Sequence, residues 1–527
     1  MVCKSMNWFN LLALVSVDRL MSPPLLRSPG FFSLLLAYSA PFLNTSLVTV
    51  AVPDLSLAFA ASSADLLWIV NISAGVGGVL VLIFGPLADQ LQAKHLFRIG
   101  LWWLSGSTLL SMVAWSLPGL VLARALAGIG AAMVLPSSYA LGMQIATRER
   151  TAHAVAMFSA ASTAGFVFGP VLSALLLTSF SWRGSFLPVL LCTGCSALML
   201  FKTSLPEHKV NRTLIDSLRV FDWLGVGLLF ALAGTGLRMI QALLSLDWLL
   251  VLLCFFAFVL IVYWLLNHLK MVANPVISLS VMIQPGFLWS VGLLVMAQLV
   301  YSGYVYLTPQ LLQLAKDTSS GTIGFLLFCV AIAGVVVSFF TPNLARRVGE
   351  RRLMLRSLLV VLLALVLLGL LAAFPPVKGF MLMFSLVSLL LCFFSPTTVL
   401  MTAHMLHSFS DDLRSTASAV LASVIRYGYI VGSLVVAAIT QAVYQYQLRP
   451  LVSSLDSQDR SILLGSLGSA ISHQNSLVSS VHVGLIEAAI RAFSDGYAVA
   501  CAALALLLAL VIVFFYFCFS PRFIGGE

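Results

Sequence analysis

The most regular feature of the chain is a series of long apolar runs separated by short polar loops. A helix needs about 20 mainly apolar residues to cross a bilayer, and fourteen runs are of roughly this length. The predicted fold class is therefore an all-α polytopic membrane protein with about 14 transmembrane helices. The helices are predicted near residues 31–53, 66–87, 97–116, 119–145, 154–178, 184–204, 223–244, 248–268, 286–308, 322–342, 354–374, 379–402, 416–440 and 494–518.

The composition agrees with this pattern. Of the 527 residues, 61% are hydrophobic and 9% are charged, whereas soluble domains carry about 25% charged residues. A soluble enzyme, a secreted disulfide scaffold and a disordered chain are therefore excluded. Cys192 and Cys195 form a C-x-x-C pair inside an apolar run. We expect them to pack as small hydrophobic side chains rather than to act in redox chemistry.

Basic residues are distributed unevenly between alternate loops. If the N-terminus is cytoplasmic, 19 Lys and Arg residues lie in loops on the cytoplasmic side and 6 on the outer side. Cytoplasmic loops carry such an excess. We therefore predict a multi-pass protein with both termini in the cytoplasm. The net charge is +10, but a nucleic acid is not an expected partner, because the basic residues form no continuous face.

One segment has a counterpart in the second half of the chain. The segment from Gly85 to Lys94 and the segment from Pro342 to Arg351 are 257 residues apart. Both leave an apolar run, carry Leu-Ala at the same place and end in a basic turn. Corresponding loops in two halves are typical of an internally duplicated transporter. The alternative is a chance similarity between two basic turns.

The first of these loops resembles a family signature. It reads Gly85-Pro-Leu-Ala-Asp89-Gln-Leu-Gln-Ala-Lys94 and is similar to the sequence G-x-L-A-D-R-x-G-R-K that follows the second helix in the major facilitator superfamily. Gln stands at two positions where the signature has Arg and Gly. In that family the Asp pairs with positive groups and helix dipoles at a cytoplasmic helix end. The resemblance implies a gating role for Asp89 and Lys94; an ordinary solvated loop acid is the alternative.

Two later runs resemble the same superfamily. Arg124, followed by small residues as far as Gly130, resembles its fourth-helix pattern, and Gly165-Phe-Val-Phe-Gly169-Pro170 resembles the fifth-helix signature of antiporters. An arginine at membrane depth costs at least about 2.5 kcal/mol unless it has a partner or a wet cavity. Such glycines allow close helix contact, and proline removes one backbone hydrogen bond. The resemblance implies conformational roles here, although a purely structural Arg124 bonded to helix carbonyls stays open.

Four further matches are similar to the fourteen-helix drug/proton antiporter branch of the superfamily, which is of the multidrug efflux type. Each match is weak alone, but they occur in the order of that branch. In chain order they start at Phe221 in F-D-W-L-G, Asn274 in N-P-V-I-S-L, Arg426 in R-Y-G-Y-I-V-G and Ala492 in A-F-S-D-G-Y.

This resemblance implies a major-facilitator fold. Two pseudo-symmetric six-helix halves are expected, with two extra helices inserted between them. The expected divisions are a cytoplasmic N-terminal segment 1–29, an N-terminal half 30–204, a linker with two extra helices 205–285, a C-terminal half 286–518 with a long outer loop at about 441–492, and a cytoplasmic tail 519–527.

The resemblance also implies a function. We expect a secondary active exporter of small amphiphilic compounds in the bacterial inner membrane, with multidrug efflux as its role, that works by alternating access around a site near the midplane. No enzyme, cofactor or metal site is expected, because no G-x-S-x-G, H-E-x-x-H or phosphate loop occurs. Candidates for the substrate cavity share a polar or aromatic side chain at membrane depth: Asn44, Asn71, Tyr139, Gln298, Tyr301, Tyr304 and Arg426.

The first run departs from the family at a position that carries chemistry. The first helix of the family typically reads L-D-x-T-I-V-N-V-A-L-P, whereas the chain reads L-N-T-S-L-V-T-V-A-V-P from Leu43 to Pro53. The acid is thereby replaced by Asn44. A carboxylate in this place attracts cationic drugs and binds the coupling proton, whereas an amide forms hydrogen bonds but does not titrate.

The charges expected at membrane depth are all positive, namely Arg124, Arg238 and Arg426. We therefore expect neutral or anionic amphiphiles to be preferred over organic cations. Proton coupling stays open: it is either weak or runs through a group such as His404 or Asp54.

Two other functions also stay open at this stage. One is a dedicated exporter of an endogenous metabolite or siderophore, and the other is a transport-inactive membrane sensor. The expected partners are a small-molecule amphiphile and the lipid bilayer, with a periplasmic adaptor as an open alternative. The chain is expected to be a monomer.

Overall fold

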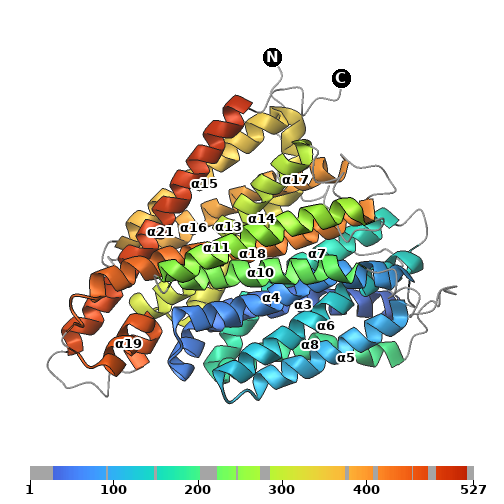
Figure 1. Cartoon of the computed structure of the whole chain (residues 1–527). Helices are drawn as coiled ribbons and strands as arrows, with labels where there is room; N and C mark the ends of the chain where they lie inside the picture. The colour runs from blue at the N-terminus through green and yellow to red at the C-terminus, as the bar shows by residue number, and fades with distance from the viewer. Residues whose placement is uncertain are drawn as a thin grey trace.

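The computed structural model is built of helices, with no strand among the residues that it describes. Most of the long helices lie in two groups that are inclined to one another (Figure 1). The described residues are 28–518 without 91–92, 147–150, 202–221, 245–246, 273–284, 374–378, 408–413, 454 and 473–481.

Each of the fourteen predicted runs coincides with one of these helices. Short 3-10 or π turns precede, continue or interrupt three of them. In chain order the elements are α3 (Pro29–Phe59), α4 (Ser63–Gln90), α5 (Ala93–Met112), α6 (Leu117–Ile145), α7 (Thr151–Ser179), η2 (Trp182–Phe186), α8 (Leu187–Phe201), α10 (Trp223–Leu244), α11 (Trp248–Met271), α13 (Pro285–Gln310), η3 (Leu311–Ala315), α14 (Ser320–Val348), α15 (Glu350–Ala373), α16 (Phe380–Leu389), η4 (Leu390–Phe394), α17 (Ser395–His407), α18 (Arg414–Leu448), α19 (Ser457–Gly465), α20 (Leu467–Ser472) and α21 (His482–Cys518).

The described helices confirm the predicted fold class. Twelve of them are long and apolar enough to cross a membrane. Two predicted spans fall outside this number: α5, which carries Lys94 and Arg98 in its first turns, and α10, of which the described residues give only the shorter apolar stretch Trp223–Gly236. The presence of fourteen crossing helices therefore stays a prediction.

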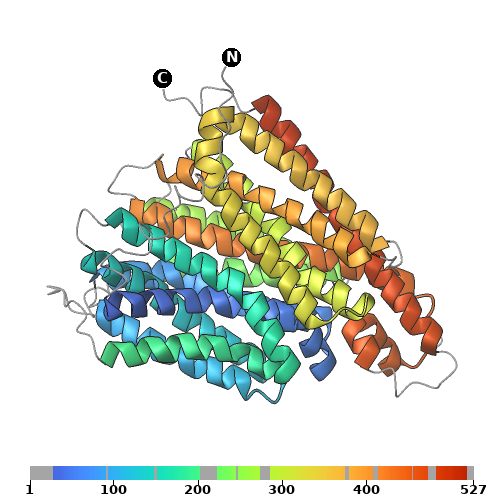
Figure 2. The same cartoon turned by 180° about the vertical axis from the view of Figure 1, so that it is seen from behind.

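The helices form two bundles. In the first bundle, α3 packs against α6, α7 and α8, while α6 also contacts α4 and α5. In the second bundle, α13 packs against α17 and α18, and α21 packs against α15 and α18. Figures 1 and 2 show the first bundle in blue to green and the second in yellow to red. α3 is apolar on all sides and about two thirds of its residues are buried, as expected for a central helix.

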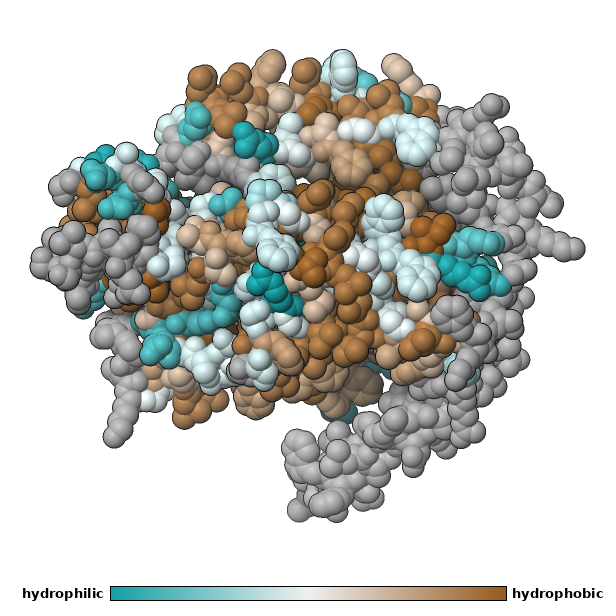
Figure 3. Space-filling model, turned by 90° about the horizontal axis from the view of Figure 1, so that it is seen from below, coloured by the Kyte–Doolittle hydropathy of each residue, from teal (hydrophilic) through white to brown (hydrophobic). Residues whose placement is uncertain are grey.

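The outer surface of the bundles is apolar. Trp102 of α5 is 64% exposed and Leu122 of α6 is 62% exposed. Brown and pale residues cover most of the described surface when the molecule is seen from below (Figure 3). Among the residues of α11 only Leu265 and Leu269 are buried, although this helix is among the most apolar. Such a surface fits a lipid environment, in which apolar side chains face hydrocarbon.

α7 approaches α3 closely where the predicted glycine motif lies. A Cβ atom on Gly165 would lie 2.6 Å from the backbone oxygen of Ser39, and one on Gly169 would meet Ser46. The Oγ atom of Ser46 donates a hydrogen bond of 3.1 Å to the backbone oxygen of Gly165. Only glycine at these two positions allows this backbone separation, so the motif joins the first and fifth helices of the bundle.

Two seams join the bundles, one between α4 and α18 and one between α7 and α14. At the second seam, a Cβ atom on Gly324 would lie 2.8 Å from the backbone oxygen of Pro170, and the rings of Phe168 and Phe328 are 5.8 Å apart. Each seam therefore pairs one helix of the first bundle with one helix of the second.

The extra helix α10 covers the seam between α4 and α18. Val226 of α10 packs with Val79 of α4 and Tyr427 of α18. Asp222, immediately before α10, lies 2.5 Å from Nε2 of His268 in the last turn of α11. The two extra helices are thus tied to each other and lie across the boundary between the bundles.

The bundles meet at the end where α19 and α20 lie, which we call the α19 end. Ser466, between these helices, donates a hydrogen bond of 2.7 Å from Oγ to the backbone oxygen of Ala61. The Oγ atom of Ser63 donates a bond of 2.7 Å to Oε1 of Gln441. Figures 1 and 2 show that the bundles converge at this end and diverge toward the opposite one.

The helices flanking the predicted outer loop are longer than expected. α18 continues to Leu448 and α21 begins at His482. The extra turns of α21 place Ile486 and Ala489 in buried positions, so an amphipathic face continues each helix beyond its fully apolar part. Near this end, burial lowers the pKa of Lys316, and the Asp495 carboxylate partly offsets the effect.

The α19 end offers a test of how the bundles are held together. A side chain on Gly468 would meet Ser56 of α3, whereas a Cβ atom on Gly465 has its nearest neighbour at 3.3 Å. We expect Gly468→Val to lower stability by about 1–3 kcal/mol, because it overpacks this contact. We also expect it to raise the labelling of a Ser63→Cys reporter by a membrane-impermeant thiol reagent in proteoliposomes.

Gly465→Val is the matched control and is expected to change neither stability nor labelling. Equal labelling of the two variants would show that the contact between α20 and α3 does not hold the bundles together.

Candidate functional site between the bundles

Arg124 is fully buried in α6 and is held by α3 and α4. Its Nη1 donates to Oδ1 of Asn44 at 2.7 Å and to the backbone oxygen of Asn44 at 3.0 Å. Its Nε donates to the backbone oxygen of Ile69 at 3.0 Å, and its Nη2 to that of Val70 at 3.5 Å. No carboxylate pairs with Arg124 in the described part of the chain. One guanidinium therefore joins three helices of the first bundle.

This arrangement satisfies the Arg124 charge without a titrating partner. Carbonyl and amide oxygens supply the electron density that a buried guanidinium needs. The amide of Asn44 accepts a hydrogen bond where a carboxylate would form an ion pair. The positive charge at this position is consequently not neutralised by an ionised neighbour.

A polar row continues from Arg124 into the second bundle. Tyr429 of α18 lies within range of an electrostatic interaction with Arg124 and also with Tyr301 of α13. We call Asn44, Arg124, Tyr429 and Tyr301 the polar row. Tyr429 is 6% exposed and was not among the candidates from the sequence. The signal that could have identified it is the R-Y-G-Y segment, which places aromatic side chains one and three residues after Arg426.

Asn71 lies at the seam between α4 and α18. The Oγ atom of Ser433 donates a hydrogen bond of 3.0 Å to Oδ1 of Asn71. Asn71 is 2% exposed, and its Nδ2 atom has no partner among the described residues. The amide therefore connects the two bundles and leaves one buried donor available at their boundary.

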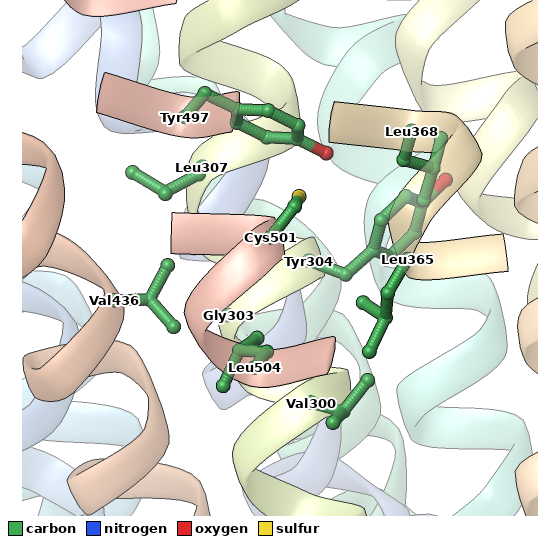
Figure 4. Close-up of a pocket in the computed structure, with 10 residues that line it drawn as sticks. All are labelled: Val300, Gly303, Tyr304, Leu307, Leu365, Leu368, Val436, Tyr497, Cys501 and Leu504. Atoms are coloured by element: carbon green, nitrogen blue, oxygen red, sulfur yellow. The ribbon is translucent and has the colours of Figure 1, made fainter. Parts of the chain in front are cut away.

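The candidates on α13 differ in their positions. Gln298 packs against Gly428 of α18, where a Cβ atom would lie 3.1 Å from the Cβ of Gln298. Tyr304 is 4% exposed and lines a cavity inside the second bundle, together with Tyr497 and Cys501 of α21 (Figure 4). The cavity volume of about 10 Å³ is close to the minimum that holds one water molecule. Tyr304 thus faces a space too small for an amphiphile.

Arg426 lies on the other side of the seam from α4. A Cβ atom on Gly77 would be 2.7 Å from Nη1 of Arg426, so the glycine leaves room for the guanidinium. Tyr38 of α3 is within electrostatic range of both Arg426 and Tyr139 of α6. The rings of Tyr38 and Tyr139 both contact Phe158, with centroids 4.9 Å and 5.3 Å away. Tyr38 was also absent from the candidates.

The remaining candidates lie outside the polar row. The side chain of Asp89 lies outside the described residues, and Lys94 is half-buried at the start of α5. Arg238 is exposed on α10 rather than buried, because α10 lies outside the two bundles. His404 of α17 accepts or donates a hydrogen bond of 2.8 Å with Glu350 of α15, away from the polar row.

The described residues hold no group of three or more His, Cys, Asp or Glu side chains that could bind a metal ion. The polar row offers hydrogen-bond donors, aromatic rings and one fixed positive charge. Such a set recognises a ligand by hydrogen bonding and stacking and has no nucleophile next to a general base.

A family model of the Major Facilitator Superfamily matches residues 34–433. The chain belongs to this superfamily. The match runs from α3 into α18 and includes the polar row, which confirms the expected family and fold class.

Several relatives carry names that refer to drug resistance. The chain is 26% identical over 343 residues to the multidrug resistance protein Stp of Mycobacterium tuberculosis, which covers 62% of this chain and 60% of that protein. It is 23% identical over 337 residues to the probable multidrug resistance protein EmrY of Escherichia coli, which covers 62% and 64%. The methyl viologen resistance protein SmvA of Salmonella typhimurium is 30% identical over 155 residues, or 29% and 31%. The chain thus spans less than two thirds of the length of these relatives.

Solved structures share the fold. A bacterial homologue of the human lysosomal transporter Spinster, in an inward-facing and unoccupied conformation, superposes with a TM-score of 0.66 at 14% identity, covering 95% of this chain and 98% of that chain. The nucleoside transporter NupG gives a TM-score of 0.51 at 13% identity, covering 92% and 98%. At these identities the similarity concerns the fold alone.

Proposed function

We propose that this chain is a secondary active exporter of small amphiphilic compounds, with multidrug efflux as its role, that works by alternating access between the two bundles. The observation that carries this proposal is the polar row, which extends from the buried Arg124 of the first bundle into the second bundle of a superfamily fold. Transporters of this kind bind their substrates near the midplane, where the repeats face each other. The names of the relatives support the multidrug role.

The chemistry of the polar row favours neutral or anionic substrates. The Arg124 charge has no carboxylate beside it within the described residues, and in a low-dielectric site an uncompensated positive charge repels cations. Asn44 does not titrate, so proton coupling through this position is weak. Transport is then driven by the substrate gradient, or by protons that bind to a group elsewhere in the chain.

The test is transport by the purified full-length chain in proteoliposomes. Three fluorescent probes are compared: neutral phenylnaphthylamine, anionic anilinonaphthalene sulfonate, and cationic ethidium. We expect flux of the first two above that of empty liposomes and little flux of ethidium, with weak dependence on an imposed pH gradient. Absence of flux for all three probes contradicts the exporter role. Strong pH-driven flux of ethidium contradicts the assigned selectivity.

The orientation is part of the proposal: the α19 end faces the outside, and both termini face the cytoplasm. In a cysteine-free background, Ser457→Cys at the α19 end and Lys270→Cys in the last turn of α11 are both at exposed positions. We expect a membrane-impermeant thiol reagent to label the first variant in intact cells and the second only after permeabilisation. The reverse pattern would invert the topology.

A further inference from the structure

Arg426 is a second cation at membrane depth, and its surroundings differ from those of Arg124. It is half-buried in α18, within the apolar span that begins at Ser423. Arg124 uses all three nitrogens on backbone and amide oxygens. Across the described residues the Arg426 guanidinium forms no hydrogen bond or ion pair, and it lies within electrostatic range of Tyr38 and Tyr427. A charge at membrane depth without a protein partner marks a candidate site for a ligand or ion.

Two hydroxyl groups lie in the same region and are also available as donors. Tyr38 lies within electrostatic range of both Arg426 and Tyr139. Neither tyrosine hydroxyl forms a hydrogen bond within the described chain. Both rings rest on Phe158, which fixes their directions relative to each other. The Oη atom of Tyr427, by contrast, donates to the backbone oxygen of Gly75 at 3.3 Å.

An aromatic surface adjoins these donors. The ring centroids of Tyr38 and Phe42 are 5.5 Å apart, and those of Phe42 and Phe166 are 5.3 Å apart. This row of rings leads from the donors along α3 and α7. Aromatic rings bind flat apolar groups with little loss of conformational entropy.

We propose that Arg426, Tyr38 and Tyr139 form a subsite for the acidic head group of an amphiphile, and that Phe42 and Phe166 bind its aromatic or apolar body. The head group is a carboxylate, sulfonate or phosphate, which a guanidinium binds through two parallel hydrogen bonds. This inference rests on the proposed function and adds a defined substrate class to it. It assigns binding of the acidic head group to Arg426, which forms no hydrogen bond within the described residues, rather than to Arg124, whose nitrogens already donate to protein oxygens.

The position of the subsite fits entry from the end opposite α19. Tyr139 is 37% exposed and lies less than two turns from the end of α6 at Ile145, on the side where the bundles diverge. The hydrogen bonds of Ser466 and Ser63 close the other end. A head group that enters from the open side therefore reaches Arg426 before it reaches the polar row.

The test measures binding to the full-length protein in phosphatidylcholine nanodiscs. Anilinonaphthalene sulfonate and phenylnaphthylamine share one aromatic skeleton and differ by the sulfonate, so the ratio of their dissociation constants isolates the head group. We expect Arg426→Gln to weaken sulfonate binding by about tenfold or more, because a charge-assisted hydrogen-bonded pair is lost. Phenylnaphthylamine binding is expected to stay within about threefold.

Conservative substitutions distinguish a loss of binding from misfolding of the variant. Arg426→Lys keeps the charge but not the two parallel bonds, and we expect an intermediate loss. Tyr38→Phe and Tyr139→Phe each remove one hydroxyl and are expected to weaken only the sulfonate probe, by about threefold. Arg183→Gln, at the α19 end, and Tyr263→Phe, on the exposed side of α11, are matched controls without an expected effect.

The outcomes separate this subsite from the proposed function. Equal weakening of both probes by Arg426→Gln, or no weakening of either, overturns the subsite. Selective weakening with no transport supports the subsite and contradicts the exporter. If phosphatidylglycerol in the nanodisc displaces the sulfonate probe, the acidic head group is that of a lipid. If inorganic sulfate at the same concentration displaces the probe equally well, the subsite does not require an apolar body.

Discussion

The Asn44→Asp variant is expected to export ethidium and to depend on the pH gradient, unlike the native chain. The new carboxylate would lie where Oδ1 of Asn44 is now 2.7 Å from Nη1 of Arg124. It would neutralise the buried guanidinium and supply a proton-binding group within the polar row. We expect the ethidium flux to rise by about tenfold when the lumen is acidic, as the repulsion of a cation by Arg124 is removed. The measurement is ethidium fluorescence in proteoliposomes with and without an imposed gradient.

Asn71→Asp is the matched control for this gain. It makes the same change in another buried amide, but Asn71 is bonded to Ser433 and not to an arginine. We expect no gain in pH-driven ethidium flux from it. Equal gains from the two variants would show that any added acid suffices, and no gain from Asn44→Asp would contradict the role assigned to Asn44.

The Arg124→Gln variant is expected to lose most transport and part of its stability. The substitution removes the donors that hold the backbone oxygens of Asn44, Ile69 and Val70. Each lost hydrogen bond to the charged group costs about 1.5–3 kcal/mol. Because these bonds join α3, α4 and α6, we expect flux of both naphthalene probes to fall by about tenfold or more. Thermal unfolding in detergent and flux at equal protein content separate the two effects.

Arg183→Gln is the control for the loss of one arginine. Arg183 donates to the backbone oxygen of Ala114 at 3.0 Å and stacks on Trp182, outside the polar row. We expect its transport to stay close to that of the native chain. Native flux and stability in Arg124→Gln would mean that the buried guanidinium neither joins the helices nor shapes the site.

The helices could be predicted from the sequence because their signal is local. An apolar run of about 20 residues forms a helix in a bilayer whatever its neighbours are, since each backbone group must find its partner within the segment. The ends of α18 and α21 were predicted too short, because amphipathic turns beyond the apolar part depend on contacts with other helices. The division of the chain into its halves stays a prediction, since residues 202–221 and 273–284 lie outside the described structure.

The candidate site could be predicted only in part. Asn44 and Arg124 were chosen separately, one from a departure in the first run and one from a charge at membrane depth, and the structure joins them in one hydrogen bond. Tyr304 has the same chemistry as Tyr301, but it faces a small cavity inside the second bundle. Which way each tyrosine points depends on its position around the helix. In a sequence where nearly every side chain at membrane depth is apolar, the pattern of polar and apolar residues does not show which face of the helix is buried.

The helical membrane fold, the family and the replacement of the family's acid by Asn44 could be predicted from the sequence, because apolar length and motif order are properties of the chain alone. Which charges are satisfied depends on how the helices pack. Arg124 is saturated by oxygens from two neighbouring helices, while Arg426 faces Tyr38 and a glycine across the seam. The physical reason is that a buried charge is stabilised by groups far away in sequence, and their distance and direction arise only when the helices pack.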